Sequence, residues 1–244
     1  MSSQGKGIQI SVINSSTALT DAELADALPA FQKQISRDLL AAWGLDATLQ
    51  LVRKGATPPP GTWWFTVLDD AEQGFQLGYH DLTPEGLPAG RLYARTAKVI
   101  EAKWSVAFSH ELLEMIVDPD VNLAVFEQTG DVLQLYAYEV CDACRADEHA
   151  YDIDGVTVSN FVYPAWFESF QKPPVRFDHV GKITAPFQLL SGGYISVNPS
   201  SQANGWQLLT ADGATPTPPR PAAGTRRARR ATPRTEWKRS AAGR

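Results

Sequence analysis

Residues 98–118 read KVIEAKWSVAFSHELLEMIVD, and Pro119 follows them. Apolar residues recur in this stretch at the spacing of an α-helix, and its second half is apolar around most of its circumference. Because proline cannot continue a helix, the helix is expected to end just before Pro119. A helix of this composition must be buried, so the rest of the fold is expected to be built around it.

The polar residues of this helix form the pattern His110-Glu111-Leu112-Leu113-Glu114. His110 and Glu114 are one helical turn apart on the same face, so an imidazole and a carboxylate can reach one cation. Glu111 lies about 100° further round the axis, where it can hold a water bound to that cation. The pattern is that of the HExxH zinc helix with its second histidine replaced by glutamate. Zinc accepts both kinds of donor, and Glu111 would then act as the general base.

A solvated surface helix is the alternative interpretation, because a five-residue pattern recurs by chance. The flanking residues argue against it, since Val106 to Phe108 and Met115 to Val117 are apolar. Burying an ionised carboxylate without a partner is costly, so a metal or another set of partners is needed. The pattern therefore favours a metal site.

A third metal ligand is expected downstream, in the stretch YEVCDAC (138–144), where Glu139 and Asp142 are both candidates. Cys141 and Cys144 form a lone CxxC with no second pair to complete a structural zinc site, so packing is the favoured role for both.

Two further histidines, His80 and His179, lie outside this pattern. His80, in the stretch GYHD, is either a core residue at a strand end or a group near the cleft, and the core role is favoured. The sequence assigns no role to His179.

The remaining pattern predicts an α+β fold, in which a mixed twisted sheet packs on a long helix and on the buried HExxE helix. A helix is expected over 22–43, with a start signal at Thr20–Glu23, an end at Gly44 and a break or kink near Pro29. Strands are expected over 8–14, 47–54, 62–70, 74–81 and 91–96. Beyond Pro119 the pattern is weaker: 132–140 is a strand or a short helix, 151–167 is a hairpin with its turn at Asp154-Gly155, and the rest is loop.

The order of these elements resembles the upper half of the zincin metallopeptidase fold. Ser109-His110-Glu111-Leu112-Leu113-Glu114, continuing to Asp118-Pro119 and then Glu139-Val140-Cys141-Asp142, is similar to an HExxE variant of that fold. The variant occurs in bacterial and phage proteins and, in looser form, in phosphate-induced or EXORDIUM-like plant proteins. The resemblance covers roughly residues 8–168.

The resemblance implies that His110 and Glu114 are metal ligands and that Glu111 is the base. It does not decide between Glu139 and Asp142 as the third ligand, although the gluzincin branch of zincins, in which a downstream Glu completes the site, favours Glu139. A carboxylate in place of the second histidine makes the metal a weaker Lewis acid and would also suit an ion harder than zinc. Fold does not fix function, so peptidase activity is an expectation by analogy.

Two functions are compatible with these residues. The first is a zinc-dependent metallopeptidase that hydrolyses peptide bonds through a metal-bound water, its peptide or protein substrate lying along the strand 74–81. The second is a non-catalytic structural or binding protein, such as a virion or cell-surface component, on a zincin scaffold.

The amino-acid composition excludes several classes of protein. The chain has 244 residues, of which 43% are hydrophobic and 20% charged, and this excludes a collagen-like, a wholly disordered or a multi-span membrane protein. Two cysteines cannot form a disulfide framework. The first twelve residues, MSSQGKGIQISV, contain no continuous apolar segment of a secretory signal, so the cytoplasm is the default compartment, with a virion or non-classical export left open.

The charge is divided unevenly along the chain. Residues 220–244 hold nine Lys or Arg and one Glu, whereas residues 1–219 hold 13 basic and 26 acidic residues. The sequence therefore predicts one folded domain over 1–210 and a disordered basic tail rich in Pro, Ala and Arg over 211–244. The tail would make a weak contact with nucleic acid or an anionic surface, or, as the favoured alternative, would be a solvated extension without a dedicated partner.

Overall fold

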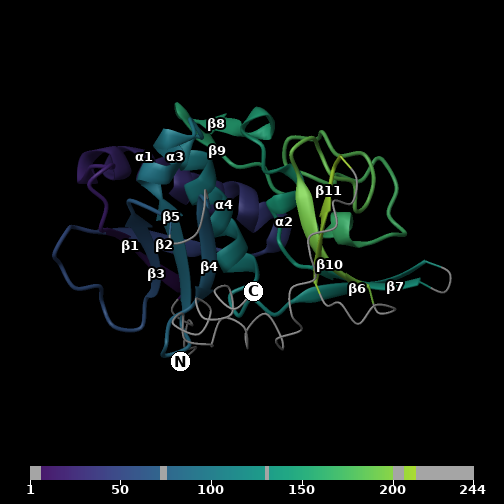
Figure 1. Cartoon of the computed structure of the whole chain (residues 1–244), viewed down its shortest axis with the longest axis horizontal. Coiled ribbons are helices and arrows are strands. Elements are labelled where there is room, and N and C mark those ends of the chain that lie inside the picture. The colour runs from purple at the N-terminus through teal and green to yellow at the C-terminus, as the bar shows by residue number, and fades with distance from the viewer. Residues whose placement is uncertain (1–6, 72–75, 130–131, 200–205, 213–244) are drawn as a thin grey trace, which may run out of the picture.

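A computed structural model describes residues 7–71, 76–129, 132–199 and 206–212 of the chain. These residues form a mixed α/β structure with several sheets and few helices (Figure 1). The largest sheet has five strands in the order β2-β1-β3-β5-β4. Its strands are β1 (Ile8–Asn14), β2 (Ala47–Val52), β3 (Trp63–Leu68), β4 (Gly78–Leu82) and β5 (Pro88–Tyr93).

Four of these strands run parallel, and β4 alone runs antiparallel to its neighbour β5. The strands predicted over 8–14, 47–54, 62–70 and 74–81 are therefore present, with ends moved by a few residues. The strand predicted over 91–96 lies earlier in the chain, because Ala94 already begins a helix. The antiparallel strand β4 ends the sheet, and this edge proves to be the one beside the candidate site.

The first helical segment follows β1 and begins as predicted. Thr20 caps α1 (Asp21–Lys33) with a capping box, in which its hydroxyl accepts from the Glu23 amide and the Glu23 carboxylate accepts from the Thr20 amide. The segment continues as a π-helical stretch η1 (Gln34–Leu39) and as α2 (Leu40–Trp43), and it ends at Gly44 with φ +69°. The predicted break at Pro29 is absent, and the change of helix type comes at Gln34 instead.

The helix predicted over 98–118 is two helices, α3 (Ala94–Val99) and α4 (Trp104–Val117). Glu101 lies between them with φ +58°, a left-handed conformation that interrupts the helical path, so the single long span was wrong at its start. The buried second half was right, because every residue of α4 from Val106 to Val117 except Glu111 is buried.

Aromatic side chains join the helices to one face of the sheet. Phe108 of α4 stacks on Phe31 of α1 with ring centroids 4.4 Å apart, and it contacts Phe65 of β3 at 4.2 Å. All three rings are fully buried. Since the two helices meet the sheet through the same ring, α1 and α4 cover the same face, and α4 lies under the edge formed by β5 and β4.

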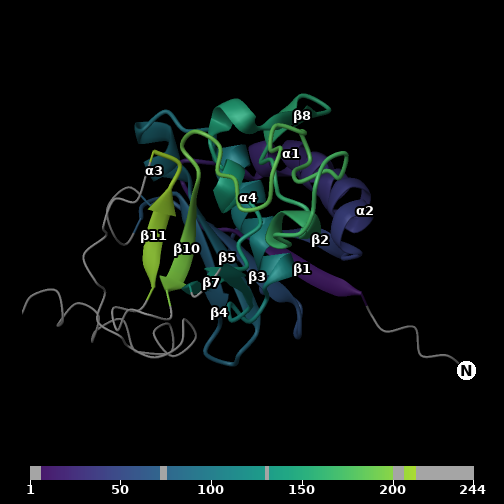
Figure 2. The ribbon, with the colours of Figure 1, turned by 90° about the vertical axis from the view of Figure 1, so that its right-hand side faces the viewer.

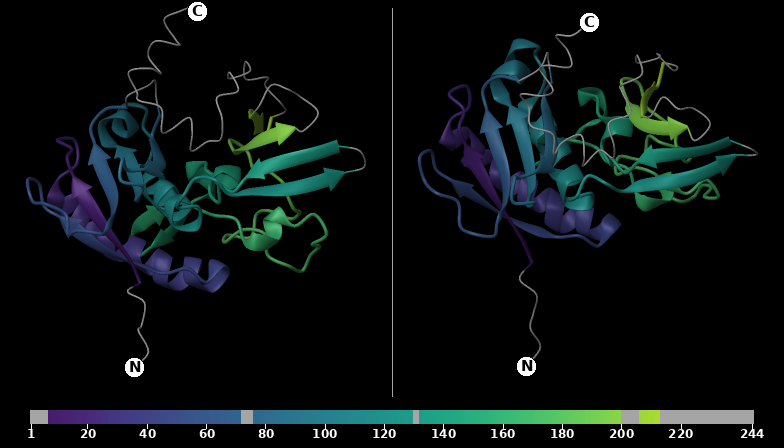
Figure 3. Two further views of the ribbon diagram at one scale, coloured as in Figure 1. Left: turned by 90° about the horizontal axis from the view of Figure 1, so that it is seen from below. Right: turned by 60° about the horizontal axis from the view of Figure 1, so that its bottom comes forward.

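A second sheet lies on the other side of α4 from the first (Figures 1 and 2). Its strand order is β11-β10-β7-β6, and the hairpin of β6 and β7 extends away from the five-stranded sheet (Figure 3). The strand or helix predicted over 132–140 is the strand β7, and the other three strands were not predicted. The strands are β6 (Ala124–Thr129), β7 (Val132–Ala137), β10 (Tyr194–Pro199) and β11 (Gln207–Thr210).

The hairpin predicted over 151–167 is present but shorter. It consists of β8 (Tyr151–Ile153) and β9 (Val156–Val158), and its turn residues Asp154 and Gly155 have φ values of +53° and +86°. Two positive φ values are what a type I′ turn needs, which is why Asp-Gly marks it in the sequence. Three 3₁₀ turns complete the described elements: η2 (Asp142–Cys144), η3 (Asp147–His149) and η4 (Pro164–Phe167).

No helix within the described ranges is both long and apolar enough to cross a membrane. The last described strand, β11, ends at Thr210, next to the predicted domain boundary at 210. Almost all of the predicted tail, including the basic residues 220–244, lies outside the described residues, so its predicted contact with nucleic acid or an anionic surface stays a prediction.

Candidate metal centre

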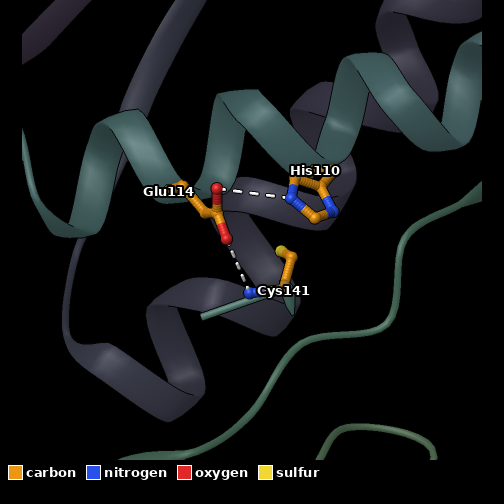
Figure 4. Close-up of side chains that lie close together, drawn as sticks. All are labelled: His110, Glu114 and Cys141. Atoms are coloured by element: carbon orange, nitrogen blue, oxygen red, sulfur yellow. Dashed lines mark hydrogen bonds and ion pairs between the residues drawn. The ribbon is translucent and has the colours of Figure 1, made fainter. Parts of the chain in front are cut away.

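The helix α4 brings His110 and Glu114 together as the sequence predicts. Nε2 of His110 lies 3.3 Å from Oε2 of Glu114 (Figure 4), and their residues are 8% and 3% exposed. Because the two residues are four apart on one helix, the contact needs no other element to form it. The helix therefore presents an imidazole and a carboxylate from a buried face.

The loop after β7 covers this pair. The amide of Cys141 donates to Oε1 of Glu114 at 3.1 Å, which fixes the loop against the helix (Figure 4). The next residue, Asp142, begins η2 and places Oδ1 3.2 Å from Nε2 of His110. Of the two predicted candidates for a third ligand, Asp142 is thus the one in contact with His110.

The other candidate, Glu139, is in contact with a different histidine. Oε2 of Glu139 lies 3.4 Å from Nε2 of His80, and both side chains are 3% exposed. The opposite ring nitrogen, Nδ1, lies 3.5 Å from Oε2 of Glu111 and 3.7 Å from Oε2 of Glu114. His80 is buried, as the favoured core role requires, but it stands among three carboxylates and not in an apolar core.

The sequence offered one signal for His80, its position in a predicted strand. The zincin resemblance implies an edge strand here, and the structure confirms that β4 ends the sheet. The side of the helix on which His80 lies depends on the antiparallel pairing of β4 with β5, which no local pattern shows. In the structure His80 is buried in β4, as the core role requires, and it also belongs to one of the two donor sets described below.

Glu111 is the member of the cluster nearest to solvent, with a side chain that is 13% exposed. Its side chain packs against the backbone of β4 at Gly78, where an added Cβ would lie 2.6 Å from Cγ of Glu111 and 2.6 Å from the carbonyl oxygen of Arg91. A side chain at position 78 would therefore displace Glu111. The glycine at the start of β4 allows the carboxylate to reach His80.

The electrostatic effects within this cluster are coupled. Burial by itself lowers the pKa of His110, but the neighbouring Glu114 and Asp142 reverse this and raise the pKa well above its usual value. Burial raises the pKa of Glu114 to about 7, the charge of His110 opposes the rise, and Asp142 and Glu139 add to it. In both shifts the neighbouring carboxylates raise the pKa, because they outnumber the imidazoles and favour any added positive charge.

Among the described residues, two sets of three donors could hold a metal ion. One set is His110, Glu114 and Cys141, and the other is His80, Glu111 and Glu114; in each set the donor atoms all lie within 4.8 Å of one another. The geometry does not fix the type of ion. Glu114 belongs to both sets.

The cysteines are free and buried, as packing residues would be. Cys141 has a second possible role that the sequence did not favour, because its sulfur lies in the first donor set, whereas Cys144 lies in neither set. Burial first, and then the charge of Glu114, raises the pKa of the Cys141 thiol well above its usual value. Without a cation this thiol therefore carries its proton.

Comparison with models of known protein families, with curated proteins and with solved structures finds no match for the chain. The function has to be argued from the cluster itself.

Proposed function

We propose that this chain is a metal-dependent hydrolase of zincin type, a zinc metallopeptidase, whose metal is held by His110, Glu114 and Asp142. One observation carries the proposal: Nε2 of His110 lies 3.3 Å from the Glu114 carboxylate and 3.2 Å from the Asp142 carboxylate inside a buried cluster. All three side chains are 11% exposed or less.

His110 and Glu114 fit a metal by chemistry and by spacing, and Asp142, which belongs to neither set of mutually close donors, would complete the set after a shift toward Glu114. Imidazole nitrogen and carboxylate oxygen are both zinc ligands, and two ligands at about 2.1 Å from a tetrahedral ion are themselves about 3.4 Å apart. The separations of 3.2 and 3.3 Å are close to that value, and they also allow hydrogen bonds between the same atoms. A metal is favoured by the buried surplus of carboxylates around His110.

The Cys141 sulfur competes with Asp142 for the third position, and Glu139 is the third ligand that the zincin resemblance favours. Asp142 is preferred to Glu139 because Glu139 contacts His80 and Asp142 contacts His110. Cys141 is the alternative third ligand, because its sulfur lies within 4.8 Å of the donor atoms of His110 and Glu114, and metal binding itself would release the thiol proton.

Each side chain then has a defined task. A bound divalent cation supplies Lewis acidity, polarising a carbonyl group and lowering the pKa of a water molecule. Glu111, on the solvent side of the cluster, would accept the proton of the attacking water and pass it to the leaving amine. The contact of Cys141 N–H with Glu114 holds the Glu114 side chain in place during these steps.

The fold supports a peptide as the substrate. The strand β4 is the edge of the five-stranded sheet, carries His80, and packs against α4. An extended chain could add to such an edge through main-chain hydrogen bonds and lie beside Glu111.

The test is hydrolysis of an unstructured protein, such as fluorescent casein, by the zinc-loaded full-length chain and by its Glu111→Gln variant. We expect the variant to lose at least 100-fold in kcat/KM while keeping zinc at His110 and Glu114, because a neutral amide cannot accept the proton. Glu148→Gln is the matched control, since Glu148 is an exposed glutamate whose nearest ion-pair partner is His149. Hydrolysis retained by Glu111→Gln would overturn the mechanism. Absence of hydrolysis by zinc-loaded wild type would leave the non-catalytic structural or binding role.

A further inference from the structure

We propose that the centre holds two divalent cations that share the Glu114 carboxylate. The first cation is that of the proposed function, and the second is held by His80, Glu114 and Oε2 of Glu111, so that the other oxygen of Glu111 serves as the proton acceptor of the proposed function. The inference rests on the proposed function for the first cation, and it adds a binding site on the strand β4.

The second donor set has the spacing of a metal site in its own right. Nδ1 of His80 lies 3.5 Å from Oε2 of Glu111 and 3.7 Å from Oε2 of Glu114. Ligands of a tetrahedral first-row ion are about 3.4 Å apart, so these separations fit with a shift of a few tenths of an ångström. The set combines one strand and one helix, which are packed together, and so it is held by the fold itself.

Glu114 lies between the two histidines. The same oxygen, Oε2, is 3.3 Å from Nε2 of His110 and 3.7 Å from Nδ1 of His80. A carboxylate that faces two imidazoles through one oxygen is placed to bridge two cations. Two-metal hydrolase sites hold their ions about 3.5–4 Å apart, a distance that one shared ligand allows.

The charge of the cluster favours two cations over one. Glu111, Glu114 and Asp142 make no ion pair with Lys or Arg in the part of the chain that the structure describes, and their ion pairs are with His80 and His110. With both imidazoles neutral, as metal binding requires, these three carboxylates carry three negative charges. One divalent cation would not compensate all three in a buried cluster, and a second one would.

Glu139 then acts on the far side of His80. Its Oε2 faces Nε2 at 3.4 Å, while Nδ1 faces the second donor set. A metal-binding histidine commonly donates its other ring N–H to a carboxylate, which fixes the ring and its tautomer. Glu139 is thereby assigned as a positioning residue for His80 and not as a ligand.

The test counts bound ions by native mass spectrometry on the full-length chain after equilibration with Zn²⁺. We expect two zinc ions per chain in wild type and one in His80→Ala. His149→Ala is the matched control and should keep two, because His149 is a buried histidine outside both donor sets, in contact with the Ser191 carbonyl.

The outcomes separate the two proposals. One zinc in wild type, or two in His80→Ala, would overturn the second site and leave the proposed function standing. No zinc in wild type would overturn both. If His80→Ala fails to fold, wild type loaded with two equivalents of Mn²⁺ provides the decision by electron paramagnetic resonance: a spin-coupled signal supports adjacent ions, and two uncoupled ions contradict them.

Discussion

Two clusters in this molecule combine histidine with carboxylate. They differ in the balance between hydrogen-bond donors and carboxylate acceptors. Around η1, the single carboxylate of Asp38 accepts hydrogen bonds from Tyr151 at 2.8 Å and from Arg37 at 2.5 and 2.8 Å, and His179 lies 3.7 Å away. Around α4, four carboxylates surround two histidines. The first cluster is rich in donors, and the second is rich in acceptors.

The pKa shifts follow this difference. Burial tends to raise the pKa of Asp38, but the hydrogen bonds from Arg37 and Tyr151 outweigh it and hold the pKa below its usual value. Burial raises the pKa of Glu114 to about 7, and the negative charge of Asp142 and Glu139 adds to the rise. A carboxylate surrounded by donors is stabilised in its charged form, whereas carboxylates gathered around imidazoles favour the uptake of protons or of a cation. The comparison separates a structural cluster from a candidate metal centre in one chain.

The largest expected effect is on stability with and without metal. At free zinc 1,000-fold above the dissociation constant, binding to the folded state should add about 4 kcal/mol to the free energy of unfolding for each site. Urea unfolding in zinc and in a chelator measures the difference. Asp38→Asn should show the same zinc response as wild type, since Asp38 lies outside both donor sets. If wild type is equally stable in zinc and in chelator, the cluster around α4 does not bind zinc in the folded state and does not differ in this respect from the cluster around Asp38.

The next effect comes from crowding Glu111. In Gly78→Ala the new methyl group would lie 2.6 Å from Cγ of Glu111 and from a backbone oxygen, so we expect a loss of about 3 kcal/mol of stability. Zinc binding at the second donor set should weaken at the same time. Gly7→Ala is the control, because nothing lies within 4 Å of its added Cβ. A Gly78→Ala protein as stable as wild type would show that Glu111 does not occupy this position.

Changing the donor-rich cluster around Asp38 should lower the free energy of unfolding by less than Gly78→Ala does, and it should not affect zinc binding. Asp38→Asn keeps the shape but removes the charge that accepts from Arg37 and Tyr151, and we expect a loss of about 2 kcal/mol in urea unfolding. Zinc content should be unchanged. Loss of zinc in this variant would mean that the two clusters are coupled.

The smallest expected effect is on the pH dependence of stability, and it comes from the carboxylate of Asp69, which lies outside both clusters. Although burial works in the other direction, hydrogen bonds from Ser16, Thr17 and Ala18 hold the pKa of Asp69 well below its usual value. The stability that Asp69 contributes is therefore present above its unfolded-state pKa of about 4 and is lost as the pH falls toward its folded pKa. Asp69→Asn should lower the free energy of unfolding by about 1 kcal/mol at pH 6 and flatten its decline below pH 4. Parallel curves for the two proteins between pH 5 and 2 would contradict this assignment.

Local signals predicted the parts of the fold that local forces determine. The capping box at Thr20–Glu23, the turn at Asp154-Gly155 and the alternating strand at 8–14 all appear where the sequence places them. The strands β6, β10 and β11 were missed. For β10 the reason is that it pairs with β7, about 60 residues earlier, and that pairing has no short-range pattern.

The candidate site divides in the same way. His110, Glu111 and Glu114 share one helix, so their spacing was sufficient to place them together. The positions of His80 and Glu139 depend on which strand ends the sheet and on how the loop after β7 folds over α4. Those are long-range features. They explain why the contacts of His80 with the carboxylates could not be predicted from the sequence.

The central claim is that the cluster around α4 binds metal through His110. The direct measurement is the zinc content of purified full-length protein by inductively coupled plasma mass spectrometry, compared among wild type, His110→Ala and His179→Ala. The account predicts bound zinc in wild type and in His179→Ala, whose histidine belongs to the donor-rich cluster, and loss of at least one zinc per chain in His110→Ala. Equal zinc in all three proteins, or none in wild type after reconstitution, would contradict it.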